Sequence, residues 1–220
     1  MPYTTLFIDL DDTLYPATTG LWPAIRDRMS EFMVERLGLS MEEVVPLRRR
    51  YYETYGTTLR GLQKHYQVDA DDFLAYVHDL PLERYIQPNA DLAALLDSLP
   101  QRKWVFTNAD DAHARRVLNV LGLSHCFQGI ADVRALHFYC KPELEAYQRA
   151  LSLAGEVDPQ RCVLIDDSPR NLVSAAALGF TTVLVSINDP DPPIGQARPG
   201  IDHVIPSLSC LPQALPQLRT

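Results

Sequence analysis

Two aspartates follow the first hydrophobic run of the chain at a spacing that could support phosphoryl chemistry. Residues 6–8 are apolar and lead directly into Asp9 and Asp11. Side chains alternate between the two sides of an extended strand, so Asp9 and Asp11 point the same way. Neighbouring carboxylates repel each other and are costly to desolvate, and a divalent cation offsets both penalties. Mg²⁺ prefers oxygen ligands and commonly keeps room for a substrate phosphate, so the segment predicts a metal-assisted phosphoryl site.

Three further polar clusters lie at or beside the carboxyl ends of predicted strands. They are Thr107-Asn108, the single Lys141, and the pair Asp166-Asp167. The carboxyl ends of parallel strands gather at one edge of a sheet, where such folds bind ligands. Each cluster taken alone also fits a turn or the start of a helix. Their occurrence together, in this order and at these element ends, favours one shared site.

Alternating strand and helix patterns predict the scaffold that brings these clusters together. Apolar runs rich in β-branched residues predict strands at residues 4–10, 103–108, 129–133, 162–167 and 181–186, with a weaker one at 203–205. Helical patterns cover residues 110–121, 142–153 and 169–178, and an irregular proline-rich loop is expected over residues 188–200. This order predicts an α/β fold in which helices cover both faces of a parallel sheet.

The segment from residue 15 to residue 88 breaks this alternation, because it contains no convincing strand. Helical patterns cover residues 41–55, 58–66 and 71–78 of it. An insert directly after the first strand would lie over the ligand-binding edge of the sheet. We therefore predict a helical cap at residues 15–88 and an α/β core formed by residues 1–14 and 89–220. A purely structural helical layer is the alternative.

The composition limits the classes of partner. The 220 residues are 46% hydrophobic and 22% charged, which is ordinary for a globular protein. The net charge of -8 argues against nucleic acid as a partner, and no apolar run approaches the ~18 residues of a membrane span. The four cysteines lack paired spacing, so free thiols and a cytoplasmic location are expected. We predict a monomer or homodimer that acts on a small phosphorylated metabolite.

The four clusters resemble the sequence motifs of the haloacid dehalogenase superfamily, whose members are mostly Mg²⁺-dependent phosphatases. The resemblance rests on residues 9–14, Thr107, Lys141 and the pair Asp166-Asp167. It implies a Rossmann-like parallel sheet of strand order 5-4-1-2-3, and the helical insert resembles the first type of cap of that superfamily. Dehalogenases of this group need neither a metal nor a second acid at the position of Asp11. The acids therefore favour phosphate-ester chemistry.

The resemblance also implies a role for each acid. Asp9 would be the nucleophile that becomes an aspartyl phosphate. Asp11 would protonate the leaving oxygen and later take a proton from the hydrolytic water. Mg²⁺ would be held by Asp9, the backbone carbonyl of Asp11 and Asp167. Asp166 would assist the metal indirectly, through water or through its neighbours.

The remaining core motifs would hold the phosphoryl group. Thr107 and the backbone N–H of Asn108 would bind phosphoryl oxygens, and Lys141 would neutralise charge on both Asp9 and the transferring group. The six histidines are scattered without metal-binding spacing, and we assign none of them a role.

A closer resemblance, to the pyrimidine 5′-nucleotidase subfamily, comes from the segment after the first motif. It rests on residues 14–16, 20–21, 37–39 and 51–62. It implies hydrolysis of nucleoside 5′-monophosphates such as UMP and CMP. Thr57, Thr58 and Arg60 of this segment would then contact base, ribose or phosphate. The alternative is that one of the two threonines only caps the following helix.

Other functions fit part of the pattern. A phosphatase or phosphomutase for sugar phosphates or pyridoxal phosphate would use the same Asp9 intermediate. A phospho-aspartate signalling module also gathers acids, a threonine and a lysine at the carboxyl edge of a parallel sheet. That module lacks a helical insert after its first strand, and its phosphorylated aspartate comes later in the chain. The enzyme is therefore the favoured interpretation.

Overall fold

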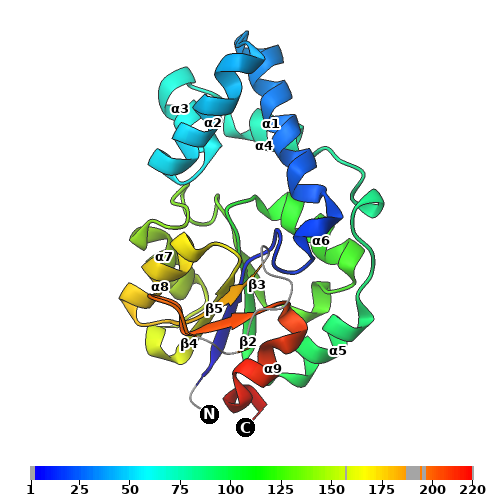
Figure 1. Cartoon of the computed structure of the whole chain (residues 1–220), viewed down its shortest axis with the longest axis vertical. Helices are drawn as coiled ribbons and strands as arrows, with labels where there is room; N and C mark the ends of the chain where they lie inside the picture. The colour runs from blue at the N-terminus through cyan, green and yellow to red at the C-terminus, as the bar shows by residue number, and fades with distance from the viewer. Residues whose placement is uncertain (1–2, 157, 187–193, 195–196, 220) are drawn as a thin grey trace.

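The computed structural model describes residues 3–156, 158–186, 194 and 197–219 (Figure 1). Within these residues, six parallel strands form one sheet of order β3-β2-β1-β4-β5-β6. The strands are β1 (Thr5–Ile8), β2 (Arg102–Phe106), β3 (Gly129–Ala131), β4 (Cys162–Asp166), β5 (Thr181–Val185) and β6 (His203–Ile205). The predicted α/β fold is confirmed. Read from the other edge, the first five strands have the expected order 5-4-1-2-3. The observed sheet differs only by the additional edge strand β6.

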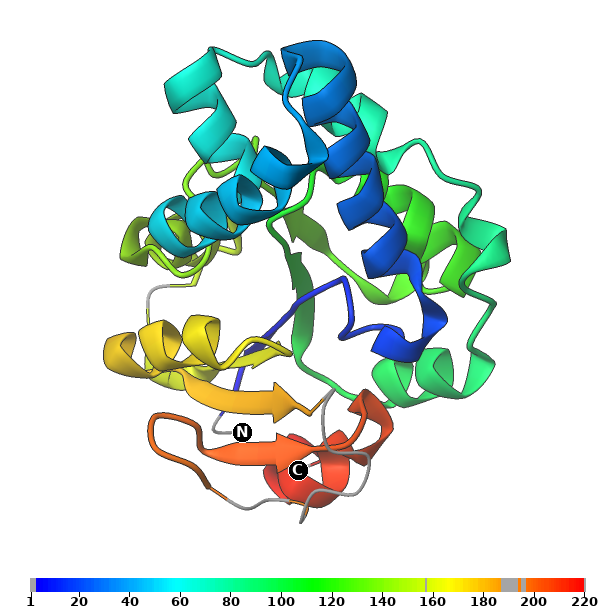
Figure 2. The same ribbon diagram turned by 45° about the horizontal axis from the view of Figure 1, so that its top comes forward.

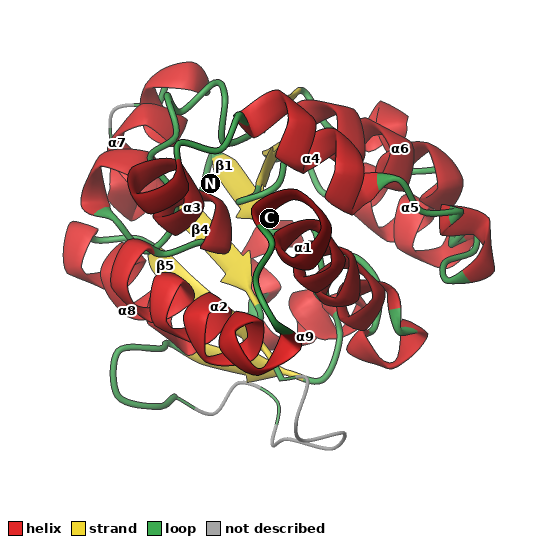
Figure 3. Cartoon of the chain, turned by 90° about the horizontal axis from the view of Figure 1, so that it is seen from above, coloured by secondary structure: helices red, strands yellow, loops and turns green. Residues whose placement is uncertain are grey.

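Alternation along β1 divides the core into two layers. Leu6 and Ile8 lie in one apolar cluster and Phe7 lies in the other, as the period of two requires. Helices cover both faces of the sheet, as a parallel sheet needs (Figure 3). The first cluster includes residues of α5 (Ala90–Ser98), α6 (Asp111–Leu121) and α9 (Leu211–Ala214), and the second includes residues of α7 (Leu144–Leu153) and α8 (Pro169–Leu178).

Strand β1 ends earlier than the hydrophobic pattern predicts. It stops at Ile8 and not at residue 10, because the chain turns at Asp12, which has a φ of 58°. The backbone N–H of Asp9 still donates to the Ile165 carbonyl at 2.9 Å. This bond fixes Asp9 at the sheet edge, directly after the central strand. Of the predicted proline-rich loop, residues 188–193, 195 and 196 lie outside the described part.

Four helices lie together beyond the carboxyl edge of the sheet (Figures 1 and 2). They are α1 (Leu21–Leu37), α2 (Met41–Tyr55), α3 (Thr58–Tyr66) and α4 (Ala70–His78). A separate apolar cluster that includes Phe32, Tyr51, Leu62 and Phe73 holds them together. The division into a cap at residues 15–88 and a core remains a prediction. No helix in the described part of the chain is long and apolar enough to traverse a bilayer.

Helix α6 shows how local sequence fixes an element next to the site. Asp110 precedes the helix and accepts a hydrogen bond from the backbone N–H of His113 at 3.3 Å, which satisfies one of the free donors of the first turn. Gly122 ends the helix in the left-handed conformation, with a φ of 73°. The predicted range of residues 110–121 thus matches α6 to within one residue.

Candidate active site

The topology brings three of the sequence clusters to one place. Strand β1 pairs with both β2 and β4, so the residues that follow these strands are neighbours. Asp9 follows β1, Thr107 follows β2, and Asp166 ends β4 with Asp167 directly after it. The predicted convergence at the carboxyl edge of the sheet therefore follows from the strand order alone.

Lys141 reaches the same place from the loop between β3 and α7. Its buried ammonium group lies 2.8 Å from Asp9 Oδ1 and 2.6 Å from Asp166 Oδ2. It also donates to the Phe106 carbonyl at 2.7 Å, so its three donors are all engaged. Asn108 holds the lysine backbone at both ends: its Nδ2 donates to the Lys141 carbonyl at 3.0 Å, and its Oδ1 accepts from the Lys141 N–H at 2.8 Å.

Asp166 and Asp167 are adjacent in sequence and differ in surroundings. Asp166 is fully buried, and its oxygens accept from Lys141, from Asn171 Nδ2 at 3.0 and 3.1 Å, and from the Ser168 N–H at 2.9 Å. It is saturated with donors and holds Lys141 in position. Asp167 lines the central cavity. Burial and the negative charge of Asp166 raise the pKa of Asp167 to about 7.

Three carboxyl groups, those of Asp9, Asp166 and Asp167, surround a single cation, the Lys141 ammonium group. Burial raises the pKa of Asp9 well above its usual range; Lys141 opposes this, whereas Asp166 and Asp167 add to it. The two aspartates that contact Lys141 outweigh its burial and raise its pKa. One oxygen each from Asp9, Asp166 and Asp167 lie within 4.8 Å of one another. Closely spaced carboxylates with an uncompensated negative charge are the donor set that suits a hard divalent cation.

Asp11 lies beside this cluster and is held by two donors that sequence reasoning missed. Tyr15 donates its hydroxyl to Asp11 Oδ1 at 2.5 Å, and His113 Nε2 lies 3.1 Å from the same oxygen. Burial alone would raise the pKa of Asp11, but His113 and Tyr15 outweigh it, and the pKa is lowered. No role was assigned to the histidines from the sequence, and this contact between His113 and Asp11 was not predicted. The available signal was its place in the first turn of the helix that follows Thr107.

A cavity of about 550 Å³ lies between the sheet edge and the helices α1 to α4. Its core wall includes Asp9, Asp11, Thr107, Asn108, Lys141 and Asp167. Its opposite wall includes Trp22, Arg26, Arg48, Tyr52, Thr57, Thr58 and Arg60. This volume is in the range of small-molecule sites. The predicted site residues of the core and of the helical segment thus line one cavity. The exception is Asp166, which contacts Lys141 and does not line the cavity.

The predicted contacts on the helical side have structural partners of their own. Thr57 caps α3, because its hydroxyl accepts from the Arg60 N–H at 3.3 Å, and it also lines the cavity. The Arg60 guanidinium forms an ion pair with Glu143 and contacts Cys140. Gly56, with a φ of 84°, lies so close that a Cβ there would meet Cys140 Sγ at 2.7 Å. Residues 56–60 therefore dock directly on the loop that carries Lys141.

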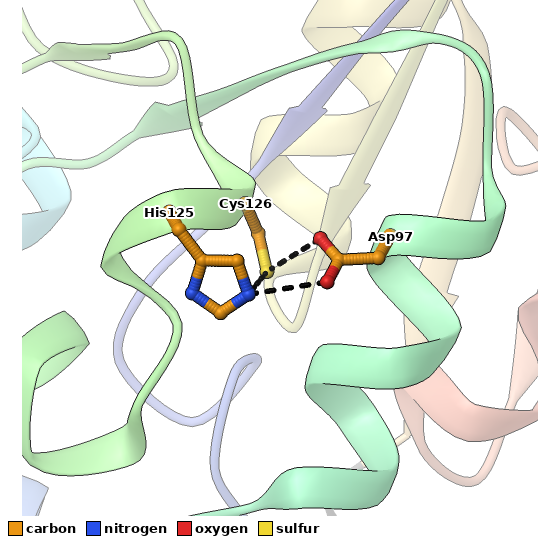
Figure 4. A group of neighbouring side chains, drawn as sticks. All are labelled: Asp97, His125 and Cys126. Carbon is orange, nitrogen blue, oxygen red and sulfur yellow. Dashed lines mark hydrogen bonds and ion pairs between the residues drawn. The ribbon is translucent and has the colours of Figure 1, made fainter.

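Asp97, His125 and Cys126 form a second group of metal-ligand types (Figure 4), and none of the three lines the cavity. His125 Nε2 lies 3.1 Å from Asp97 Oδ2, and the Cys126 thiol donates to Asp97 Oδ1 at 3.5 Å. Burial and this bond raise the pKa of Cys126 to about 11, so its sulfur keeps its proton. The group is a hydrogen-bonded tie between α5 and the short turn Ser124–Cys126.

Comparison with known proteins places this site in context. The family model of haloacid dehalogenase-like hydrolases matches residues 3–179. Phosphate metabolism protein 8 of Saccharomyces cerevisiae is 32% identical over 199 residues, which are 83% of this chain and 61% of that protein. The chain thus spans less than two thirds of the length of this curated relative.

Solved structures share the fold at low sequence identity. The HAD-hydrolase YfnB from Bacillus subtilis, described as bound to magnesium, has a TM-score of 0.63 at 18% identity, with coverage of 98% of this chain and 99% of that one. A HAD phosphatase from Thermococcus onnurineus has a TM-score of 0.62 at 20% identity, with coverage of 99% and 100%.

Proposed function

The chain belongs to the haloacid dehalogenase-like hydrolase family, and on this premise we propose that it is a Mg²⁺-dependent phosphomonoesterase. The observation that carries the proposal is the Lys141 ammonium group bound between Asp9 and Asp166, with Asp167 beside them in the cavity. A lysine in this place can stabilise both the attacking carboxylate and an anionic group that approaches it.

In this reaction Asp9 is the nucleophile. A carboxylate oxygen of Asp9 forms a bond to phosphorus while the bond from phosphorus to the ester oxygen breaks. The leaving oxygen takes a proton from Asp11, which must bind that proton against the lowering of its pKa by His113 and Tyr15 in the ligand-free chain. A water molecule then attacks phosphorus, gives a proton back to Asp11, and releases inorganic phosphate and free Asp9.

The residues present fit a magnesium ion. Asp9, Asp167 and the backbone carbonyl of Asp11 would hold it, with Asp166 acting through its hold on Lys141. The fit rests on the clustered carboxylate oxygens and on the excess of negative charge that raises the pKa of Asp9 and of Asp167. When bound, the metal supplies positive charge that offsets repulsion between Asp9 and an anionic phosphate.

Thr107 and Asn108 bind the phosphoryl oxygens in this proposal, and Lys141, whose three donors are already engaged, contributes its positive charge beside them. Thr107 is almost fully buried at the end of β2, and its hydroxyl accepts from the Ala109 N–H at 3.0 Å. Its own proton is therefore available to a phosphoryl oxygen. The side chain of Asn108 is committed to the Lys141 backbone, which leaves its own N–H for the substrate.

Nucleoside 5′-monophosphates are the substrate class that we favour. The cavity extends from the carboxylates to Trp22 and Tyr52, whose rings could stack on a base, and to Arg26 and Arg48. Thr57, Thr58 and Arg60 line the same wall. We place the enzyme in the cytoplasm as a monomer or homodimer.

A phosphate-release screen tests the function. UMP, CMP, AMP, pyridoxal phosphate and sugar phosphates are incubated with the enzyme and Mg²⁺, and the reactions are repeated with excess EDTA. We expect phosphate release that EDTA abolishes and Mg²⁺ restores, with pyrimidine monophosphates hydrolysed fastest. Equal rates on all esters would contradict the nucleotide assignment. Turnover unaffected by EDTA would contradict the metal, and an isomerised sugar phosphate would indicate a mutase.

A further inference from the structure

Two histidine rings are packed against each other where α4 meets α6. His113 belongs to the first turn of α6, and its side chain has no exposed surface. His78 is the last residue of α4, and its ring stacks on that of His113 with 4.1 Å between the centroids and 16° between the planes. Buried polar rings are costly unless their nitrogens have partners, so these partners show what the rings do.

His113 directs one nitrogen at the Asp11 carboxyl group. Its Nε2 lies 3.1 Å from Asp11 Oδ1, the oxygen that also accepts from the Tyr15 hydroxyl at 2.5 Å. Two donors from separate segments of the chain therefore converge on one oxygen. A carboxyl group bound in this way cannot rotate freely, and its other oxygen, Oδ2, is left for proton transfer, because Asp11 lines the cavity.

The partners of the rings also assign the proton on His113. Its Nδ1 is buried and has no hydrogen-bond partner among the described residues. A ring nitrogen that faces a carboxylate oxygen carries a hydrogen, so Nε2 is the nitrogen that donates to Asp11. Asp110 fixes the arrangement from behind: its Oδ1 accepts from the His113 N–H and lies 3.0 Å from His78 Nδ1.

We propose that His113 is the positioning residue that holds the Asp11 carboxyl group in place for proton transfer to the leaving oxygen. This inference rests on the proposed function, in which Asp11 is the general acid. When the bond from phosphorus to the ester oxygen breaks, its electron pair stays on that oxygen, which takes the Asp11 proton. The carboxylate that remains is stabilised by the hydrogen bonds from His113 and Tyr15.

Leaving-group dependence separates positioning from a general structural role. A nitrophenolate leaves without a proton, whereas the alkoxide of an alkyl ester needs one. The measured quantity is kcat/KM, because it covers the steps up to departure of the leaving group. The probes are p-nitrophenyl phosphate and the alkyl ester that the wild type hydrolyses fastest in the screen above.

His113→Phe keeps an aromatic ring against His78 and removes the donor. In this variant we expect kcat/KM for the alkyl ester to fall by about 10- to 100-fold, which is part of the usual contribution of an acid catalyst. For p-nitrophenyl phosphate, kcat/KM should fall by less than about threefold. His113→Gln keeps an N–H donor at the same reach and should recover most of the loss. The control is Val117→Ala, because Val117 lies in the same helix and is also buried. This variant should change kcat/KM for both esters by the same factor.

Equal losses on both esters in His113→Phe would overturn the inference, as would a His113→Gln variant no better than His113→Phe. The variant Asp11→Asn distinguishes a failure of the positioning role of His113 from a failure of the proposed function. If it shows the selective loss while His113→Phe does not, only the positioning role fails. If Asp11→Asn also loses both esters equally, or the wild type hydrolyses neither, the proposed function fails.

Discussion

Replacing Asp9 with asparagine should reduce phosphate release by at least about a thousandfold, because an amide oxygen cannot attack phosphorus. The variant should fold normally, since the amide has nearly the same volume and Asp166 still binds Lys141. The measurement is steady-state phosphate release with Mg²⁺ on the best ester of the screen. Activity that survives Asp9→Asn would mean that another group is the nucleophile.

We also predict how Asp9→Asn changes the thermal stability of the folded chain. Because burial and two other aspartates raise the pKa of Asp9, its ionised form is less stable in the folded chain than in the unfolded chain. Removing its charge at pH 7 without Mg²⁺ should therefore leave the Tm unchanged or raise it. Asp97→Asn, on the surface of α5, is the matched control and should keep wild-type activity. A large fall in Tm for Asp9→Asn would show that the pairing with Lys141 dominates.

Replacing Lys141 with methionine should harm both activity and stability. The variant leaves Asp9 and Asp166 buried without their shared cation, which costs about 3–5 kcal/mol when a buried ion pair is broken. Phosphate release should fall by about a hundredfold or more, because the fixed positive charge beside Asp9 and the transferring group is lost. Denaturant unfolding and phosphate release check the two effects.

Lys103 provides a matched control for Lys141. It is also buried, but its ammonium group donates to the carbonyls of Leu99 and Gln101 and not to carboxylates. Lys103→Met should lower stability through lost hydrogen bonds and retain the kcat of the folded enzyme. If Lys141→Met behaved in the same way, with reduced stability and normal kcat, the lysine would be structural only.

The sequence predicted the parts of the site that depend on strand ends. Asp9, Thr107 and Asp166 meet because each ends or follows a strand of a parallel sheet, and hydrophobic runs mark such strands. Lys141 was grouped with them because it precedes a predicted helix, and the resemblance gave it a role beside Asp9; a loop after β3 has no pattern that directs a side chain. The resemblance supplied the strand order as well, apart from β6.

The sequence did not predict contacts that depend on packing between distant segments. His113 meets Asp11 across 102 positions of the chain, and no spacing rule relates a helix turn to a loop after another strand. The Asn108 side chain clamps Lys141, whereas only its backbone N–H was assigned a role. Arg60 was expected to contact substrate, and its pairing with Glu143 depends on how α3 docks on the core.

Trapping of the phosphorylated intermediate tests the central claim most directly. Asp11→Asn should still be phosphorylated by p-nitrophenyl phosphate, whose leaving group needs no acid, but should hydrolyse the intermediate slowly because the base is missing. Acid-quenched protein should then carry close to one phosphoryl group per chain, on the peptide that contains Asp9. Release of nitrophenol and free phosphate in equal amounts with no label on the protein, or a label on another residue, would contradict the account.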